Sequence, residues 1–248
     1  MPNDAIFVRA KMVAADGLVV GGLTPLTTLD YPDHLSCVVF TQGCPLRCGY
    51  CHNPHLIANE AQEKAPSWRY VRDFLERRQG LLQAVVFSGG EPTQQAALLP
   101  AVQEVAALSF QVALHTAGIY PKRLAQLLPY LSWVGLDIKA SPDRYPQVVG
   151  RPRLAPKVQQ SLELLAAAQL PFEVRVTLHP FDFDQQHLEA LLTWLGDYSL
   201  GQVVLQLARP GPCLDPRYAE LDQPFPRPLL EAVISRYQSQ FKQLLLRG

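Results

Sequence analysis

The sequence predicts a single α/β domain built as a partial (β/α)6 barrel, a parallel sheet curved part of the way round with helices on its outside. From about residue 35 onward, short runs of Val, Ile, Leu and Phe alternate with longer stretches of helical periodicity. This alternation is typical of parallel strands joined by crossover helices. The short runs are almost continuously apolar, as expected of strands that are covered on both faces.

Each element of this pattern can be placed on the sequence. Strands are expected at Ser36–Thr41, Ala84–Ser88, Gln111–His115, Trp133–Ile138, Phe172–Leu178 and Val203–Leu207. Helices are expected at Trp68–Arg78, Gln95–Leu108, Pro121–Leu128, Val158–Ala168, Gln185–Leu195 and Leu229–Leu246. Six βα units are two short of a closed eightfold barrel, so the barrel is expected to be partly open. A doubly wound sheet is the alternative.

Residues 1–248 are expected to form this one domain, with a core at about 20–210. An N-terminal extension would cover residues 1–20. The break Pro224–Pro228 would precede a C-terminal helical segment at about 226–248.

Composition narrows the range of partners. Apolar residues make up 48% of the chain and charged residues 18%, which is enough apolar material for a large core. The 22 basic and 22 acidic residues cancel and no basic block occurs, so neither a nucleic acid nor a membrane surface is expected as a partner. The N-terminus lacks the layout of a signal peptide, and no apolar run is long enough to span a membrane. A cytoplasmic location is therefore expected.

The strongest chemical signal follows the first strand, where TQGCPLRCGYCHNP places Cys44, Cys48 and Cys51 in C-x3-C-x2-C spacing. Such clustering fits a metal site better than a disulfide framework. Three thiolates can bind three irons of a cubane cluster and leave the fourth iron open. A zinc site with His52 or His55 as the fourth ligand is an alternative, and so is chance clustering.

The same segment, read as C-x3-C-x-Φ-C with Tyr50 as the aromatic residue, resembles the signature of the radical S-adenosylmethionine (SAM) superfamily. The longer string Gly22–Pro54 resembles the activating enzymes of glycyl-radical proteins, most of all those that activate anaerobic ribonucleoside-triphosphate reductase. The resemblance implies an oxidoreductase with one [4Fe–4S] cluster on the three cysteines and SAM on the open iron. Reductive cleavage of SAM would yield a 5′-deoxyadenosyl radical, which abstracts a hydrogen atom. A glycyl-radical protein and a flavodoxin or ferredoxin reductant are the implied partners.

The resemblance also assigns residues to SAM. Ser88–Thr93, SGGEPT, lies at the end of the second strand and resembles the motif that holds the SAM amino group, which implies roles for Gly89, Gly90 and Glu91. Tyr50 is expected beside the adenine. The alternative for the SGGEPT segment is an ordinary turn, and the alternative for Tyr50 is ordinary loop packing.

Asp137 and Lys139 end the fourth strand, and residues two apart point to the same side of a strand. They resemble the D-x-K motif that lies near the SAM carboxylate and a monovalent cation, and a plain ion pair is the alternative. His115 stands where related enzymes have an aspartate that helps to bind this cation. A neutral imidazole is a poor ligand for a hard cation, so the cation site is doubtful and His115 could instead bond to the ribose or the carboxylate of SAM.

Arg175 and His179 resemble a family region that reaches the SAM ribose or carboxylate, although a structural partner for Arg175 is equally compatible. Gln206 is a weaker candidate. Cys37 is expected in the core, and Cys213 receives no role. The segment Asp30–Pro32 is expected, from the resemblance alone, near the mouth of the barrel.

Two alternatives stay open at this stage. One is a different radical SAM enzyme, either an activase of another glycyl-radical protein or an enzyme acting on a small molecule. The other is a non-enzymatic zinc-binding module. The homolytic chemistry that the resemblance implies needs no general acid or base.

Overall fold

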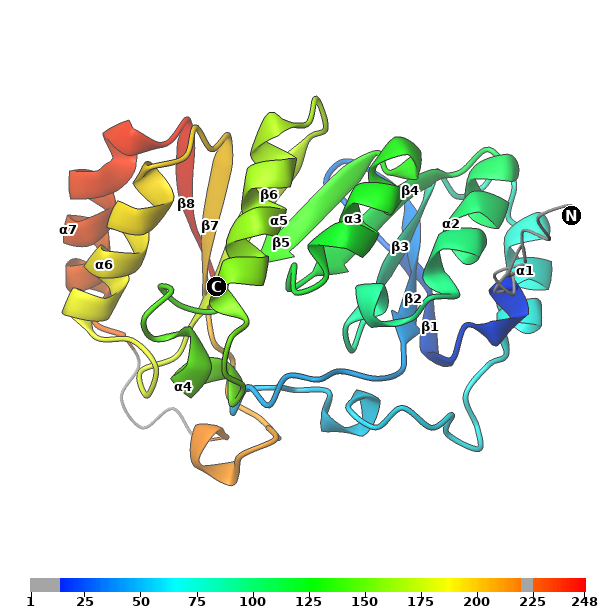
Figure 1. The fold of residues 1–248 in the computed structure, drawn as a ribbon, viewed down its shortest axis with the longest axis horizontal. Helices are drawn as coiled ribbons and strands as arrows, with labels where there is room; N and C mark the ends of the chain where they lie inside the picture. Colours follow the sequence, from blue (N-terminus) through cyan, green and yellow to red (C-terminus); the bar gives the residue numbers. More distant parts are fainter. Residues whose placement is uncertain (1–13, 220–224) are drawn as a thin grey trace, which may run out of the picture.

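The computed structural model describes residues 14–219 and 225–248. It contains one eight-stranded sheet in which the strands follow one another in chain order (Figure 1). The strands are β1 (Val20–Thr27), β2 (Ser36–Thr41), β3 (Ala84–Gly89), β4 (Gln111–Thr116), β5 (Trp133–Asp137), β6 (Phe172–Leu178), β7 (Gln202–Leu207) and β8 (Gln243–Arg247). Strands β2 to β8 are parallel, and β1 is antiparallel to β2. This confirms the α/β fold with a parallel sheet.

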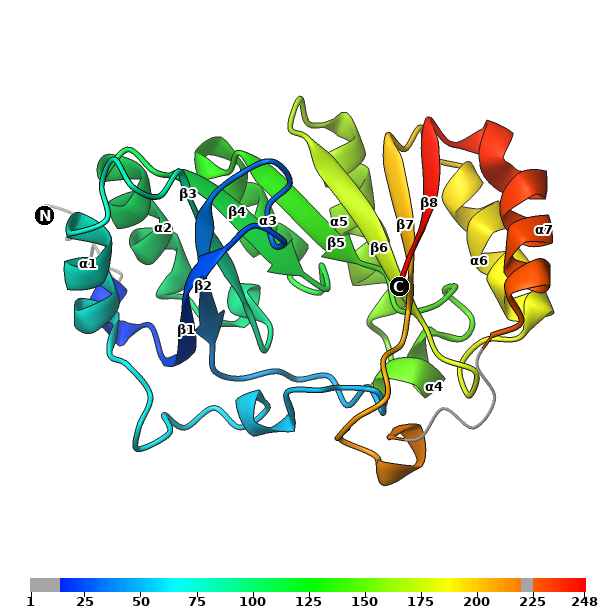
Figure 2. The ribbon, with the colours of Figure 1, turned by 180° about the vertical axis from the view of Figure 1, so that it is seen from behind.

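Helices cover one face of the sheet, and the other face is seen in front of them in Figure 2. The α-helices are α1 (Trp68–Glu76), α2 (Leu98–Ala107), α3 (Pro121–Leu127), α4 (Tyr145–Val149), α5 (Ala155–Ala167), α6 (Gln185–Gly196) and α7 (Arg227–Tyr237). Short 3-10 turns occur at Ala15–Gly17, Pro54–Leu56, Pro92–Gln94, Leu128–Tyr130, Pro216–Tyr218 and Gln238–Gln240. None of the helices in the described ranges is both long and apolar enough to cross a membrane.

The ends of several helices follow from local sequence. Ser67 begins α1 by accepting a hydrogen bond from the Tyr70 N–H, and Asp184 does the same for α6 with the His187 N–H. Proline occupies the first turn of α3 and α5, where its missing N–H costs no helical hydrogen bond.

The core has two parts because alternate residues of each strand face opposite ways. Val85 and Phe87 of β3 pack with the helices in the larger part. Val86, between them, faces the inner side of the sheet. The second part consists of Tyr31, Val38, Ala84, Val86, Ala113 and Trp133.

Two predictions about the chain ends need correction. The expected helix Leu229–Leu246 stops at Tyr237 in α7, and Gln243–Arg247 forms β8 beside β7. The predicted helical C-terminal segment is therefore wrong in its last part. β1 begins at Val20, where the extension was expected to end, whereas residues 1–13 and Pro224 of the predicted break lie outside the described residues.

Candidate functional site

A cavity opens at the carboxyl ends of the parallel strands, beneath the loop that follows β2. It brings together most of the residues predicted for the site, although they come from four different strand ends. Those that line it are Cys44, Cys48, Tyr50, Cys51, Gly89, Gly90, Glu91, His115, Asp137 and Lys139. Ser88, the first residue of the SGGEPT motif, also lines it. Thr116, Ala117 and Thr177 line it too and received no role from the sequence, because small residues at strand ends give no signal of their own.

Gln42 shapes the cysteine loop and was not predicted. Its buried side-chain amide donates to the carbonyl oxygens of His55 and Ala58 at 2.8 and 2.9 Å. The Gly43 N–H and the Cys44 N–H donate to the carbonyls of Leu56 and Ile57. The loop is thus folded back on itself, with its cysteines turned toward the cavity.

The three thiols fit an iron–sulfur cluster. Burial raises the pKa of Cys44 to about 12, with a smaller contribution from Glu91, and burial raises the pKa of Cys48 to about 11. Without metal the Cys44 and Cys48 thiols are therefore neutral, and binding of iron would deprotonate them. In the described part of the chain, no three His, Cys, Asp or Glu side chains converge on a position for one metal ion. A cubane does not require such convergence, because each thiolate binds a different iron.

Gly89, the last residue of β3, and Gly90, which follows it, lie against the cysteine loop. The Gly90 N–H donates to the Thr41 carbonyl at 2.9 Å, and the Glu91 N–H donates to the Gly43 carbonyl at 2.8 Å. A Cβ atom on Gly90 would overlap the Gly43 backbone, and Gly89 has a φ of 113°. Glycine is needed here because two backbones meet and one of them is left-handed.

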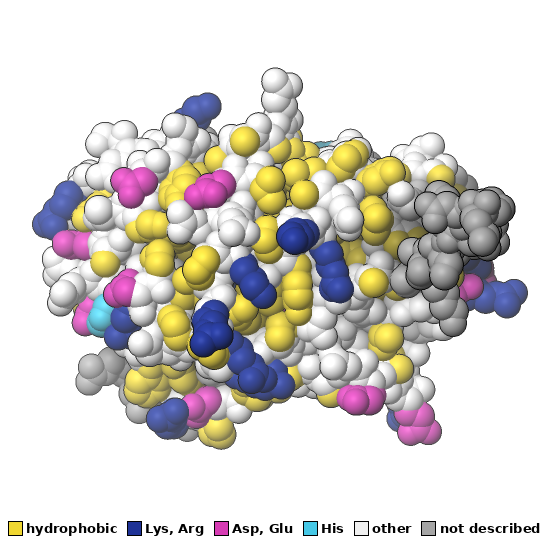
Figure 3. All heavy atoms as spheres, viewed as in Figure 1, with side chains coloured by type: hydrophobic (Ala, Val, Ile, Leu, Met, Phe, Trp, Pro, Cys, Tyr) yellow, Lys and Arg dark blue, Asp and Glu magenta, His cyan; other side chains and the backbone are white. Residues whose placement is uncertain are grey.

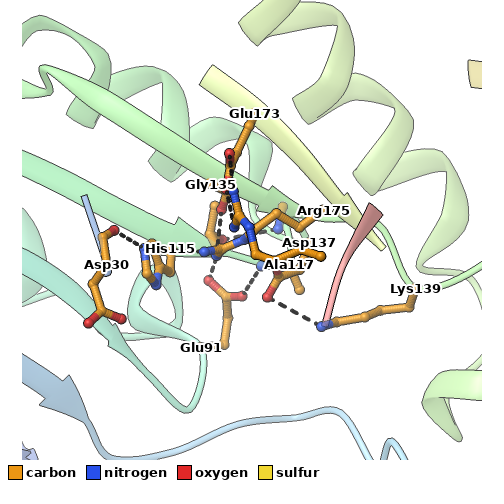
Figure 4. Close-up of polar contacts among 12 residues, drawn as sticks. Asp30, Glu91, His115, Ala117, Gly135, Asp137, Lys139, Glu173 and Arg175 are labelled. Atoms are coloured by element: carbon orange, nitrogen blue, oxygen red, sulfur yellow. Dashed lines mark hydrogen bonds and ion pairs between the residues drawn. The ribbon is translucent and has the colours of Figure 1, made fainter. Parts of the chain in front are cut away.

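Glu91 is buried and anchors the two neighbouring strand ends. Its Oε1 accepts from the Thr116 hydroxyl at 2.6 Å and from the N–H and hydroxyl of Thr93. Its Oε2 accepts from the Ala117 N–H at 2.8 Å (Figure 4). Burial raises the pKa of Glu91, and these hydrogen bonds oppose the effect. Oε2 has one lone pair left for a ligand donor.

Asp137, at the end of β5, forms the centre of a charged group with Arg175 in the middle of β6 and Lys139 (Figure 4). Arg175 Nε donates to its Oδ1 at 2.8 Å, and Lys139 Nζ lies 3.3 Å from its Oδ2. Burial alone would raise the pKa of Asp137, but Arg175 and Lys139 outweigh it and lower the pKa to about 2. Gly135 makes room for the guanidinium, since a Cβ there would lie 2.6 Å from Arg175 Cζ.

His115 connects this charged group to the segment after β1. Its Nε2 lies 2.8 Å from the Asp30 carbonyl oxygen and 3.3 Å from Arg175 Nη1. Only a protonated Nε2 can donate to the carbonyl, which leaves Nδ1 as the acceptor. Burial lowers the pKa of His115 to about 3, helped by the nearby Arg175, so the imidazole is neutral.

Arg175 and His179 do not line the cavity, and their contact with SAM stays a prediction. Arg175 has Asp137 as its structural partner. His179 is buried, and its Nδ1 accepts from the Phe181 N–H at 3.2 Å, while its ring centroid lies 4.4 Å from that of Tyr218. Gln206 pairs with Thr177 in the sheet and is half-buried outside the cavity. Cys37 is fully buried in the core, as expected.

Residues 208–219, which follow β7, cover the outer side of the cysteine loop. The Leu214 N–H donates to the Cys51 carbonyl at 3.0 Å, and the Asp215 N–H donates to the Gly49 carbonyl at 3.1 Å. A Cβ atom on Gly49 would overlap the Tyr218 ring, whose hydroxyl donates to Asp182 at 2.9 Å. The sequence did not reveal this contact, because the two segments lie far apart in the chain.

Comparison with known proteins gives the family. The Radical SAM superfamily model matches residues 38–195. A Methanocaldococcus jannaschii protein described as a glycyl-radical enzyme activating enzyme is 27% identical over 214 residues, which cover 83% of this chain and 86% of that protein. The pyruvate formate-lyase-activating enzyme of Clostridium pasteurianum is 33% identical over 125 residues, 46% of this chain and 50% of that enzyme.

Solved structures agree on the fold. SuiB of Streptococcus suis bound to S-adenosylmethionine superposes with a TM-score of 0.64 at 13% identity, covering 84% of this chain and 48% of SuiB. QueE of Escherichia coli superposes with a TM-score of 0.57 at 16% identity, covering 93% of this chain and 94% of QueE. This chain thus spans about half the length of SuiB and nearly all of QueE. With the cysteine loop at the carboxyl ends of a parallel sheet and a family match over more than half of the sequence, the chain belongs to the radical SAM superfamily, and it is a radical SAM enzyme.

Proposed function

We propose that this enzyme is an activase that cleaves SAM reductively and generates a glycyl radical on an anaerobic ribonucleoside-triphosphate reductase. The observation that carries the SAM chemistry is one cavity lined by three cysteines, a glycine-rich strand end and an Asp–Lys pair. Two relatives described as activating enzymes support the activase role. The choice of reductase rests on the resemblance of Gly22–Pro54 alone.

Each group of residues has a distinct task in this proposal. Cys44, Cys48 and Cys51 would hold a [4Fe–4S] cluster, which together with SAM supplies the homolytic chemistry. Glu91 Oε2 would accept a hydrogen bond from the SAM ammonium, because it accepts only one hydrogen bond within the described residues. Lys139 would attract the SAM carboxylate, since it is a cation that lines the cavity.

The neutral His115 suits a hydrogen bond better than cation binding. Its Nδ1 could accept from a ribose hydroxyl, because its Nε2 is already directed at Asp30. Asp137 already has two cationic partners, Arg175 and Lys139, so the carboxylate does not depend on a bound metal cation for charge balance.

A direct test is electron paramagnetic resonance of the anaerobically reconstituted enzyme mixed with SAM, a reductant and the purified reductase. We expect a glycyl doublet that is absent with Cys48→Ala. Cys213→Ser is the matched control, because this cysteine lies outside the cavity and its hydrogen bonds to Gly211 and Tyr218 carbonyls suit a hydroxyl. It should retain the doublet.

Substrate choice is tested separately from SAM chemistry. SAM cleavage without a doublet on the reductase, together with a doublet on another glycyl-radical protein, would overturn the proposed partner. Stoichiometric zinc with no SAM cleavage would overturn the proposal altogether.

A further inference from the structure

A group of exposed cations lies beside the Cys44–Cys48 part of the cysteine loop, which residues 208–219 do not contact through the hydrogen bonds described above. Arg47 lies within the loop, Arg151 and Arg153 lie between α4 and α5, and Lys157 lies in the first turn of α5. Together they are called the basic surface here. Figure 3 shows Lys and Arg side chains gathered around the lower ends of α3 and α5, with few acidic side chains among them. Within the described ranges, none of the four forms a salt bridge.

This surface is hydrogen-bonded directly to the chain between two of the cysteines. Arg47 Nη1 donates to the carbonyls of Cys44 and Leu46 at 2.9 and 2.7 Å. Arg151 Nε donates to the Pro45 carbonyl at 2.8 Å. The Arg47 N–H donates to the Val149 carbonyl at 2.9 Å, which joins the loop to the end of α4.

The two sides of the loop differ in what they face. Cys44, Leu46 and Cys48 line the cavity, whereas Arg47 is exposed and does not. SAM would therefore occupy the inner side, and the basic surface lies beside the Cys44–Cys48 segment, to which it is hydrogen-bonded. A protein that delivers electrons must come close to the cluster without entering the cavity, because electron transfer slows steeply with distance.

We propose that the basic surface docks an acidic electron-transfer protein, which passes one electron to the cluster through the Cys44–Cys48 segment. The donor's reduced flavin or iron–sulfur centre is oxidised by one electron, and the [4Fe–4S] cluster is reduced by one, with no atom transferred. This inference rests on the proposed function, since it requires a cluster that must be reduced. The whole chain has a net charge of zero. Four cations on one surface are therefore a local feature that suits recognition of an acidic partner, and not a consequence of a generally basic protein.

Charge complementarity accounts for the kind of complex that such a donor needs. Electron-transfer complexes have small interfaces and must dissociate after each transfer. Opposite charges accelerate the encounter and orient it without requiring a large apolar contact, and the effect falls as salt is added.

The test uses Arg153→Glu/Lys157→Glu, two positions whose side chains form no hydrogen bond in the described structure. Glutamate in the first turn of α5 is compatible with the helix dipole, so folding is preserved. The matched control is Arg69→Glu/Arg77→Glu, which makes the same change in net charge at exposed positions in and next to α1, at the far end of the sheet (Figure 1).

Two measurements are made on the reconstituted holoenzyme. The first is the Kd for an acidic flavodoxin at low and high salt. The second is the rate of SAM cleavage driven either by the reduced flavodoxin or by a photoreduced deazaflavin, a small reductant that needs no docking surface. For Arg153→Glu/Lys157→Glu we expect a Kd raised about tenfold or more at low salt, a flatter salt dependence and a matching loss of flavodoxin-driven cleavage. Deazaflavin-driven cleavage should be unchanged, and the control should match the unmodified enzyme throughout.

Unchanged flavodoxin affinity would overturn the inference. It would also fall if deazaflavin-driven radical formation on the reductase were lost, because the surface would then serve the glycyl-radical protein. Failure of the proposed function looks different: the unmodified enzyme would not cleave SAM with either reductant, and the binding measurement would still decide whether the surface docks the donor.

Discussion

The inner face of the sheet is apolar in its first half and polar in its second. From β2 to the start of β5, it carries Val38, Val86, Ala113 and Trp133, which pack with Tyr31. From the end of β5 to β8, the same face carries two ion pairs, Asp137–Arg175 and the pair between the buried Glu173 and the exposed Arg247. The boundary runs through Trp133, whose ring lies in a T-shaped arrangement with the His115 ring and has the Arg175 guanidinium over its face.

The difference separates two tasks on one surface. Side chains in the first half stabilise the fold by burial, which needs no charge. Charged groups in the second half are costly to bury without partners, so they are paired with one another. Mutations in the two halves should therefore have different effects on stability. The effects should differ in size, in their dependence on pH and in whether a second mutation reverses them.

The largest expected effect lies in the apolar half. Trp133→Ala should lower the free energy of unfolding by about 3–5 kcal/mol, because it leaves a cavity beneath Tyr31 and removes the face on which Arg175 lies. Chemical denaturation of the cofactor-free protein measures it. Trp194→Ala on the half-buried side of α6 is the control, and an equal loss there would contradict the special position of Trp133.

In the polar half, Arg175→Met should cost about 2–3 kcal/mol, below the range for a fully buried pair because the Asp137 side chain is 32% exposed. The variant leaves the carboxylate with Lys139 alone. Asp137→Leu added to Arg175→Met should recover part of the loss, as measured by the same denaturation. A double variant as unstable as Arg175→Met alone would show that the loss of stability does not come from the unpaired Asp137 carboxylate.

His115 at the boundary should make stability depend on pH. Its folded pKa of about 3 lies below the unfolded value of 6.5, so the unfolded chain binds a proton first as the pH falls. This part of the free energy of unfolding is fully present above pH 6.5 and is lost progressively as the pH falls from 6.5 to 3. Relative to His115→Gln, the protein should lose about 2 kcal/mol between pH 7 and pH 5. Parallel denaturation curves at both pH values check this, and a constant difference between the two proteins would contradict it.

The smallest effect is expected at Glu91, which binds the ends of β3 and β4 together. Glu91→Gln should cost about 1–2 kcal/mol, because an amide cannot accept from both the Thr93 N–H and the Ala117 N–H in either orientation. Glu76→Gln, at an exposed position of α1, should cost nothing measurable. If chemical denaturation found both variants equally stable, the hydrogen bonds of the buried Glu91 carboxylate would not stabilise the contact between these strand ends.

The central six strands were predictable because their apolar runs are dense and bounded by turn residues. The edge strands were not. β1 contains two glycines and a proline, VGGLTPLT, which read as loop, and it pairs only as an antiparallel edge. β8 follows α7 without a Gly or Pro stop, so QLLLR continued the helical pattern until tertiary pairing with β7 overrode it.

For the site, the cysteine spacing and the resemblance of the strand ends pointed to ten residues that line the cavity, whereas Arg175 and His179 do not line it. Which side chains bond to one another could not be predicted from the sequence. The hydrogen bond from Arg175 to Asp137, for example, depends on the space that Gly135 leaves because it has no side chain. The same holds for Gln42, whose amide holds the loop through carbonyls more than ten residues away.

The cover formed by residues 208–219 bears on how such sequences are recognised. A gene product truncated after Leu207 would still contain the complete cysteine motif and all of the first seven strands. It would lose the amide donors to the Gly49 and Cys51 carbonyls, and the Tyr218 ring would no longer shield Gly49 from water. An intact motif is therefore not sufficient evidence of a complete cysteine loop: the segment that follows β7 has to be present as well.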